Sequence, residues 1–170
     1  MGVVMSVKPI RPKRLRVDAV RLELLNALRA EGREQVDILK QTVQGWQGET
    51  PNFEALIGLG GGEATLIVGP TGSEKAVQKW QWLDEGTKPH TITARRAPFL
   101  RFRTLYSPST TPGEFASRGS MKYGPWARRI SVQHPGTEAR GWSPKLQQLR
   151  KQKFVDAMND ALKRGMEKAT

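Results

Sequence analysis

Apolar residues recur at steps of three and four from position 17 to 28 and again from 36 to 43, which is the spacing of one face of an α-helix. The positions of this stripe are Val17, Val20, Leu24, Leu28, Val36, Leu39 and Val43. Glycine costs about 1 kcal/mol relative to alanine inside a helix, so Gly32 predicts a kink or a break between two helices. Gly45 is the expected end of the helical segment, because glycine is favoured just past a helix C-terminus.

Between positions 46 and 72 the apolar pattern shifts to a period of two, which is typical of β-strands. The residues that share a face are Phe53, Ala55 and Ile57 in a first run and Ala64, Leu66 and Val68 in a second. Consecutive glycines at 60–62 lie between the two runs. We therefore expect two antiparallel strands joined by a glycine turn.

The segment 76–83 contains two tryptophans, Trp80 and Trp82, at the spacing of residues on one face of a strand. If the segment is helical, the same two side chains diverge. We predict a strand here, or a short helical entry into one.

After Gly86 the chain is polar and interrupted by prolines, with one strand candidate at 98–105, where apolar residues alternate with arginines. The segment 107–126 has no apolar period and is rich in Ser, Thr, Pro and Gly, which indicates a long irregular loop. A further short strand is expected at 127–132.

Ser143 followed by Pro144 is a favourable helix start, with serine at the cap and proline at the first helical position. An apolar stripe then continues the helix to about Gly165. The order of helix, strands and helix predicts an α+β fold, in which the N- and C-terminal helices pack on an antiparallel β-sheet that carries a long irregular loop. We expect residues 17–166 to form this single domain, between a basic extended arm at 1–16 and a tail at 167–170.

The formal net charge of +12 is unevenly distributed along the chain. Five basic residues and no acid precede position 17, whereas residues 17–85 contain six basic and eleven acidic residues. Residues 86–130 contain nine basic residues and one acid, Glu114. This polarity indicates a subunit whose basic loops face a polyanion or an acidic protein, the alternative being ordinary solvated surface.

The sequence contains no cysteine and two histidines, His90 and His134, which excludes disulfides and thiolate metal sites and leaves few nitrogen ligands. Stability must therefore come from packing or from oligomerisation. The apolar stretches are too short to span a bilayer, and the N-terminus lacks the apolar core of a signal peptide. We expect a protein that is made and used in the cytoplasm, or in a particle assembled there, with no membrane partner.

Two short sequence motifs, which we call phrases, give more specific information about the kind of protein. The first is Trp82-Leu83-Asp84-Glu85-Gly86-Thr87-Lys88-Pro89-His90, followed after a basic turn by Ala97-Pro98-Phe99-Leu100-Arg101. The second is Val132-Gln133-His134-Pro135-Gly136-Thr137. In this order the phrases resemble the tail-completion or neck (head-tail joining) proteins of long-tailed bacteriophages, including relatives of the minor tail protein Z type. The resemblance covers residues 80–142, and the helices on either side agree in kind.

This resemblance implies a structural subunit without enzymatic activity or cofactor. It implies a homo-oligomeric ring, expected to be a hexamer because phage tails have six-fold symmetry, that joins tail to head and leaves a passage for DNA. The implied location is the neck or tail of the virion. The implied partners are further copies of the chain, a tail tube or tail terminator protein, and head connector proteins.

The proline and glycine residues of the two phrases are of the types that favour turns. Pro135 sets φ near roughly −65° and Gly136 supplies a positive φ, which together meet the requirement of a type II turn. Gly86 is expected to act in the same way, and Pro89 favours an extended conformation at residue 88. The candidate assembly motifs, with the histidines as hydrogen-bonding side chains, are Glu85, Gly86, Thr87, Pro89, His90, His134, Pro135, Gly136 and Thr137.

Six arginines are candidates to face a partner: Arg95, Arg96, Arg101, Arg103, Arg128 and Arg129. We favour acidic faces of adjacent rings over DNA phosphates, because a passage through which DNA slides gains little from tight phosphate contacts. Tryptophan suits a buried core and a subunit interface equally well. The candidate interface aromatics are Trp80, Trp82, Trp126 and Trp142.

Two other classes of function compete with this interpretation. The net charge and the basic arm fit a general nucleic-acid-binding protein, although the sequence lacks RNA-recognition phrases and a helix-turn-helix pattern. A metal or acid-base site would combine His90 and His134 with nearby carboxylates, but no third nitrogen ligand and no HExxH spacing is present. Activity lost on alanine substitution of either histidine would support that second class.

Overall fold

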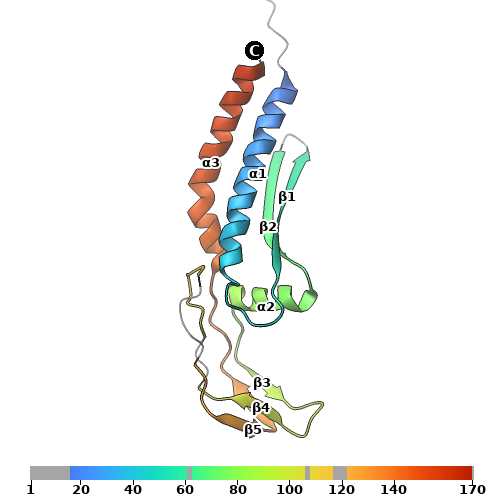
Figure 1. Ribbon diagram of the computed structural model, residues 1–170, viewed down its shortest axis with the longest axis vertical. Coiled ribbons are helices and arrows are strands. Elements are labelled where there is room, and N and C mark those ends of the chain that lie inside the picture. Colours follow the sequence, from blue (N-terminus) through green and yellow to red (C-terminus); the bar gives the residue numbers. More distant parts are fainter. Residues whose placement is uncertain (1–15, 61–62, 106–107, 117–121, 170) are drawn as a thin grey trace, which may run out of the picture.

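A computed structural model of the chain describes residues 16–60, 63–105, 108–116 and 122–169, and all but the last residue of the expected basic arm lies outside these ranges. The elements in chain order are α1 Val17–Gln41, β1 Asn52–Gly60, β2 Glu63–Thr71, α2 Glu74–Glu85, β3 His90–Thr93, β4 Leu100–Arg103, β5 Trp126–Arg129, β6 Ser131–His134 and α3 Trp142–Ala169. The predicted α+β class, with helices near both ends of the chain, is confirmed. Figure 1 shows an elongated molecule, with the helices and the β1–β2 hairpin at one end and β3 to β6 at the other. We call these two ends the body and the tip.

The strands of the fold do not form the single sheet that was expected. They form three separate two-stranded antiparallel sheets, which pair β1 with β2, β3 with β6, and β4 with β5. The predicted strand at 127–132 is in fact two strands that separate at Ile130 and take different partners. The strand expected at 98–105 is shorter and forms β4.

The long helices α1 and α3 lie side by side in the body (Figure 1). Small residues on α3, Ala161 and Gly165 among them, are buried along this contact. A Cβ atom added at Gly165 would lie 2.6 Å from the Cα of Val20, so glycine allows the two backbones to approach closely. The helix also continues past Gly165 to Ala169, beyond the predicted end, because glycine is tolerated in a helix when tertiary packing offsets its intrinsic cost.

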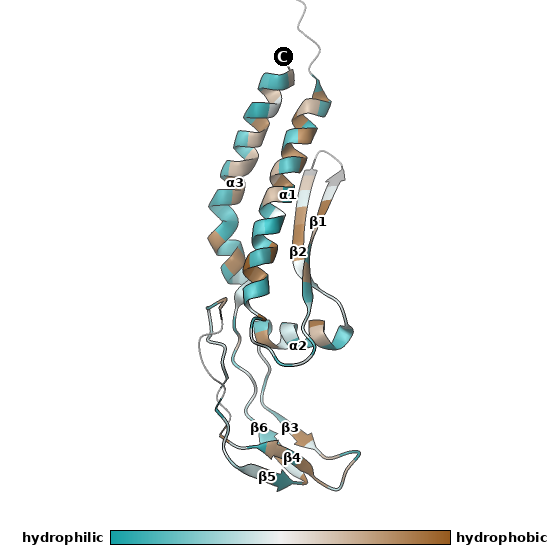
Figure 2. Cartoon of the chain, in the orientation of Figure 1, coloured by the Kyte–Doolittle hydropathy of each residue, from teal (hydrophilic) through white to brown (hydrophobic). Residues whose placement is uncertain are grey.

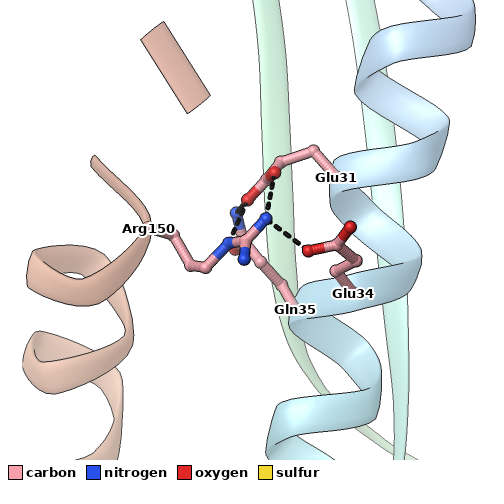
Figure 3. Close-up of polar contacts among 4 residues, drawn as sticks. All are labelled: Glu31, Glu34, Gln35 and Arg150. Carbon is pink, nitrogen blue, oxygen red and sulfur yellow. Dashed lines mark hydrogen bonds and ion pairs between the residues drawn. The ribbon is translucent and has the colours of Figure 1, made fainter. Parts of the chain in front are cut away.

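A buried ion pair joins the same two helices (Figure 3). The guanidinium of Arg150 donates to both carboxylate oxygens of Glu31, at 2.8 Å from Nε and 2.6 Å from Nη2. Glu31 and Arg150 are only 4% and 8% exposed, while the more exposed Glu34 also approaches Arg150 at 2.5 Å. The bidentate hydrogen bond lowers the pKa of Glu31 and raises that of Arg150.

The hairpin of β1 and β2 packs on α1 through alternate side chains. Its register places Ala55 opposite Val68 and Ile57 opposite Leu66. Gly32, which was expected to kink or break the helix, instead sits under this hairpin in a continuous α1. A Cβ there would lie 2.8 Å from the Cβ of Ala55, so the glycine provides room for the strand.

The core of the body is aromatic. Trp80 packs edge-to-face on Phe53, with ring centroids 5.5 Å apart, and stacks on Trp142 at 5.6 Å. The indole of Trp80 donates a hydrogen bond of 2.9 Å to the hydroxyl of Thr42, which donates to the carbonyl of Leu39 at 2.6 Å. The α-helix α1 ends at Gln41, and backbone hydrogen bonds to carbonyls three residues earlier continue the chain as turns to Gly45, whose φ is 81°.

The segment 76–83 is helical, so the preferred prediction of a strand was wrong. Ser73 caps α2 by accepting a hydrogen bond from the amide of Ala76 at 3.3 Å. As expected for a helix, the two tryptophans diverge: Trp80 is 3% exposed and Trp82 is 54% exposed. No helix in the described ranges is long and apolar enough to cross a membrane.

Candidate interaction surface

The two phrases that carry the family resemblance meet in space, between the body and the tip. Thr87 and Thr137 form an isolated antiparallel bridge. The amide of Thr87 donates to the carbonyl of Thr137 at 2.9 Å, and the amide of Thr137 donates back to the carbonyl of Thr87 at 3.1 Å. The amide of Thr137 also approaches the hydroxyl of Thr87 at 2.9 Å. We call this pairing of residues 86–87 with 136–137 the clasp.

Both glycines of the clasp have the positive φ that the sequence predicted, but residues 134–137 form no hydrogen-bonded turn, because the amide of Thr137 pairs with the carbonyl of Thr87 instead. Gly86 has a φ of 78° and Gly136 a φ of 88°, in the left-handed region that side chains other than glycine's rarely adopt. A Cβ at Gly86 would lie 2.7 Å from the carbonyl oxygen of Thr137. A Cβ at Gly136 would overlap the carbonyl oxygen of Thr87 even more closely. Each glycine therefore makes room for the threonine of the opposite phrase.

The two histidines stack beside the clasp. His90 of β3 and His134 of β6 are cross-strand partners, and their rings lie 5.0 Å apart at an angle of 27°. Nδ1 of His134 accepts the amide hydrogen of Gly136 at 3.1 Å, and Nδ1 of His90 lies 2.9 Å from the carbonyl oxygen of Lys88. Both side chains thus hydrogen-bond to the nearby backbone, as the sequence predicted. Among the described residues, no group of three or more His, Cys, Asp or Glu is placed to hold a metal ion.

Asp84, the residue before Glu85, connects the clasp to the body through hydrogen bonds. Its buried carboxylate accepts hydrogen bonds from the amide and the hydroxyl of Ser143, at the start of α3. A carboxylate in this position complements the positive end of the helix dipole. The backbone carbonyls of Leu83 and Asp84 accept the amides of Arg140 and Gly141 at 2.8 and 3.0 Å. The end of α2 is therefore joined to the start of α3.

Part of the expected long loop at 107–126 is packed against this junction. The indole of Trp142 donates to the carbonyl of Glu114 at 2.7 Å, and the amide of Gly113 donates to the carbonyl of Arg140 at the same distance. The buried side chain of Arg140 donates to the hydroxyl of Thr110 at 2.9 Å. Residues 108–116 are thus held by the body, while 117–121 lie outside the described ranges.

The tip contains all six arginines that were expected to face a partner. Arg95 and Arg96 lie between β3 and β4, and the other four lie on β4 and β5. All six side chains are exposed, and none forms an ion pair with a carboxylate in the described part of the chain. Between Glu85 and Glu138 the sequence offers a single acid, Glu114. The tip is therefore uniformly cationic.

Aromatic rings hold several of these guanidinium groups in place. Arg101 and Arg103 each lie 4.6 Å from the ring centroid of Trp126, and Arg128 lies 4.9 Å from that of Phe99. A guanidinium stacked on a ring keeps its N-H edge available for a carboxylate or a phosphate. Arg101 and Arg128 are direct cross-strand partners, a like-charge pairing that is unfavourable without an anion nearby. The arrangement fits an anionic partner.

Among the residues that the structure describes, the tip has no hydrophobic core of its own. None of the described residues in β3, β4, β5 or β6 is buried. Trp126 is 54% exposed and Ile130 is 71% exposed. The candidate interface tryptophans thus divide, since Trp80 and Trp142 are core residues and Trp82 and Trp126 are surface residues.

Sequence reasoning missed two features of this arrangement: the carboxylate of Asp84 at the start of α3, and the pairing of Glu31 with Arg150. Both join residues that are far apart in the sequence, so no local pattern signals them. The spacing of Ser73 from the helix-forming residues after it was the signal that would have identified α2. No family model, no curated protein and no solved structure matches the chain.

Proposed function

We propose that this chain is a non-enzymatic structural subunit of a ring at the head-tail junction of a long-tailed bacteriophage. The observation that supports the proposal best is the clasp. The phrases that resemble neck and tail-completion proteins are 50 residues apart at Thr87 and Thr137, yet their backbones pair directly. The glycines of the two phrases allow this pairing, because a Cβ atom at either one would overlap the backbone of the opposite phrase.

The proposed role follows from the way the clasp divides the molecule. The body has its own core, and the clasp holds the cationic tip at a fixed place relative to it. Copies of the chain form a ring, expected to be a hexamer, that leaves a passage for DNA. The arginines of the tip contact acidic surfaces of the adjacent ring, either the tail tube or tail terminator protein or the head connector. The assembled location is the neck of the virion.

The direct test removes the protein from the phage that encodes it. An early stop codon in the gene is expected to give filled heads and separate tails, which electron microscopy of the lysate distinguishes from whole particles. Supplying the wild-type chain from a plasmid should restore joined particles. Normal virions in the absence of the protein would rule the proposal out.

The unpaired charge of the tip favours one alternative, a general DNA-binding protein. If all six arginines contact phosphates, the logarithm of the binding constant for duplex DNA should fall with a slope of roughly −5 against the logarithm of salt concentration. A structural subunit that contacts acidic proteins should bind free duplex weakly at physiological salt. Fluorescence anisotropy with a labelled duplex at several salt concentrations separates the two functions.

A further inference from the structure

The β1 strand has an open edge. Its sheet contains only β1 and β2, so the nine-residue β1 has no strand partner on its other side within the described ranges. Proteins usually protect such an edge with proline, lysine or a covering segment. The sequence of β1 contains neither proline nor lysine, and its single charged residue is Glu54. The edge is therefore free to pair with another extended chain.

A groove of about 400 Å³ runs along β1 where the strand faces α1. Its apolar surface comes from Val36, Phe53, Ala55 and Ile57, and its charged surface from Arg29, Arg33, Asp37, Lys40 and Glu54. A third strand added to the β1 edge would point alternate side chains into this groove, because successive side chains of a strand face opposite sides of the sheet. The groove thus selects every second residue of its ligand.

The charges in the groove favour an acidic ligand. Lys40 pairs with Asp37 at 3.0 Å, whereas Arg29 and Arg33 form no ion pair with a carboxylate in the described part of the chain. These two arginines are one helical turn apart, about 5 to 6 Å between Cβ atoms. Alternate residues of an extended strand are about 6.7 Å apart, so carboxylates at alternate positions match them.

The outer face of the hairpin favours a ligand that is apolar at the intervening positions. Leu56 and Ile67 are cross-strand partners on this face and are 62% and 60% exposed. In Figure 2 parts of both β1 and β2 have the brown colour of hydrophobic residues. Apolar residues of an added strand would lie next to Leu56 and would shield part of this exposed apolar face from water.

We propose that the β1 edge binds an extended segment of another protein as a third strand, with carboxylates facing Arg29 and Arg33 and apolar side chains beside Leu56. This mode is β-augmentation, in which backbone hydrogen bonds supply affinity and the alternating side chains supply specificity. The chain's own N-terminal residues 1–16 do not fit, because they carry five basic residues and no acid. The site is separate from the tip and holds whether or not the chain belongs to a phage neck.

The test uses the full chain and a defined probe, a fluorescein-labelled nine-residue peptide of alternating valine and glutamate. We expect saturable binding in fluorescence anisotropy. A peptide of alternating valine and lysine should not bind, and N-methylation of alternate amides of the first peptide should weaken binding by about tenfold or more, since it removes the edge hydrogen bonds. No saturation, or equal binding of all three peptides, would refute the proposal.

Substitutions in the protein test whether the peptide binds in the groove beside β1. Arg29→Glu combined with Arg33→Glu should weaken binding about tenfold or more, because it reverses the charge of the groove. The matched control is Arg21→Glu combined with Lys151→Glu, which reverses two exposed basic residues outside both the groove and the tip and should leave binding unchanged. Circular dichroism checks that both variants retain the helices. Equal loss in both variants would show a nonspecific charge effect and overturn the assignment.

Two further outcomes would assign the edge to a different occupant and so reject a partner strand. If the probe binds only after residues 1–15 are deleted, that arm occupies the groove. If sedimentation shows an oligomer that Leu56→Lys dissociates and the probe competes with, the occupant is a second copy of the chain. Under our proposal, probe affinity is unaffected by the deletion, and Leu56→Lys weakens probe binding without changing the oligomeric state.

Discussion

The body and the tip come from one chain but shield their side chains from water in different ways. In the body, Leu28 and Trp142 are completely buried, and a buried ion pair joins the two long helices. In the tip, the largest side chain, Trp126, is 54% exposed and its neighbours are guanidinium groups rather than apolar residues. Hydrophobic burial therefore stabilises the body, while it contributes little to the tip.

The difference separates a part of the chain that is stabilised by burial from a part whose charged side chains stay exposed. A two-stranded ribbon without a core is marginally stable in water. The tip is held by its connection to the body, through the backbone pairing of Thr87 with Thr137 and the bonds of Asp84 to Ser143. Its arginines can then remain exposed. Substitutions should accordingly lower stability strongly in the body and weakly in the tip.

The largest expected effect is that of Trp142→Ala in the body. Removing a fully buried tryptophan that stacks on Trp80 leaves a cavity and should lower the free energy of unfolding by about 3 to 5 kcal/mol. Urea titration followed by circular dichroism measures the loss. Trp82→Ala is the matched control, because Trp82 is more than half exposed and should cost less than about 1 kcal/mol. Equal losses would contradict the placement of the core.

The next largest effect is expected for Arg150→Met. This change leaves the carboxylate of Glu31 buried without its bidentate partner and should cost about 3 kcal/mol or more. The double variant Glu31→Leu with Arg150→Met removes both charges and should recover much of the loss. A double variant that is as unstable as the single one would show that packing, rather than the unpaired charge, determines the cost.

The same ion pair predicts a pH dependence. Hydrogen bonding to Arg150 lowers the pKa of Glu31 below its ordinary value of 4.5. The pair therefore contributes its full stabilisation above the pKa of the unfolded chain and loses it as the pH falls through the lower pKa of the folded protein. In Arg150→Met the buried carboxylate favours its neutral form, so the stability gap between wild type and variant should narrow below about pH 4.5. Urea midpoints measured between pH 3 and 7 test this; a constant gap would contradict it.

A smaller and more local effect is expected for Gly136→Ala in the clasp. The added Cβ would overlap the carbonyl oxygen of Thr87, and alanine disfavours a φ of 88°. Hydrogen exchange should accelerate at the amides of Thr87 and Thr137 while protection at Leu28 in the body is retained. Gly45→Ala is the control, because Gly45 has a φ of 81° but open space around its Cα, so its effect isolates the strain of the backbone alone.

Local signals were sufficient for part of the fold and not for the rest. The apolar stripe of α1, the alternation in the hairpin and the positive φ at Gly136 are short-range patterns, and the structure confirms each of them. The strand prediction at 76–83 failed because the spacing of two tryptophans outweighed the cap at Ser73. A period of two over so short a segment does not distinguish a strand from a helix that buries only one of the two residues.

Long-range contacts explain the remaining differences. Gly32 predicted a kink or a break because the low helix propensity of glycine is evident from the sequence alone. The strand that this glycine accommodates comes from a distant part of the chain and is not evident there. The chain bends sharply at Ile130, which is 71% exposed, so one expected strand becomes two strands in different sheets. The two glycine-threonine segments of the clasp were identified from their residues. Their pairing with each other could not be predicted, because it joins residues that are far apart in the sequence.

The smallest effect on stability should come from Trp126→Ala in the tip. Exposed contacts between a guanidinium and an aromatic ring contribute about 0.5 to 1 kcal/mol, so the urea midpoint should barely change. Under the proposed neck function, Trp126 orders Arg101 and Arg103 for an anionic partner, so the same substitution should nevertheless reduce the number of head-tail joined particles in the complementation test of the proposed function. Arg101→Lys combined with Arg103→Lys keeps the charge but loses planar stacking, and should reproduce the defect. A destabilisation as large as that of Trp142→Ala would mean that the tip has a core after all, and the contrast with the body would no longer hold.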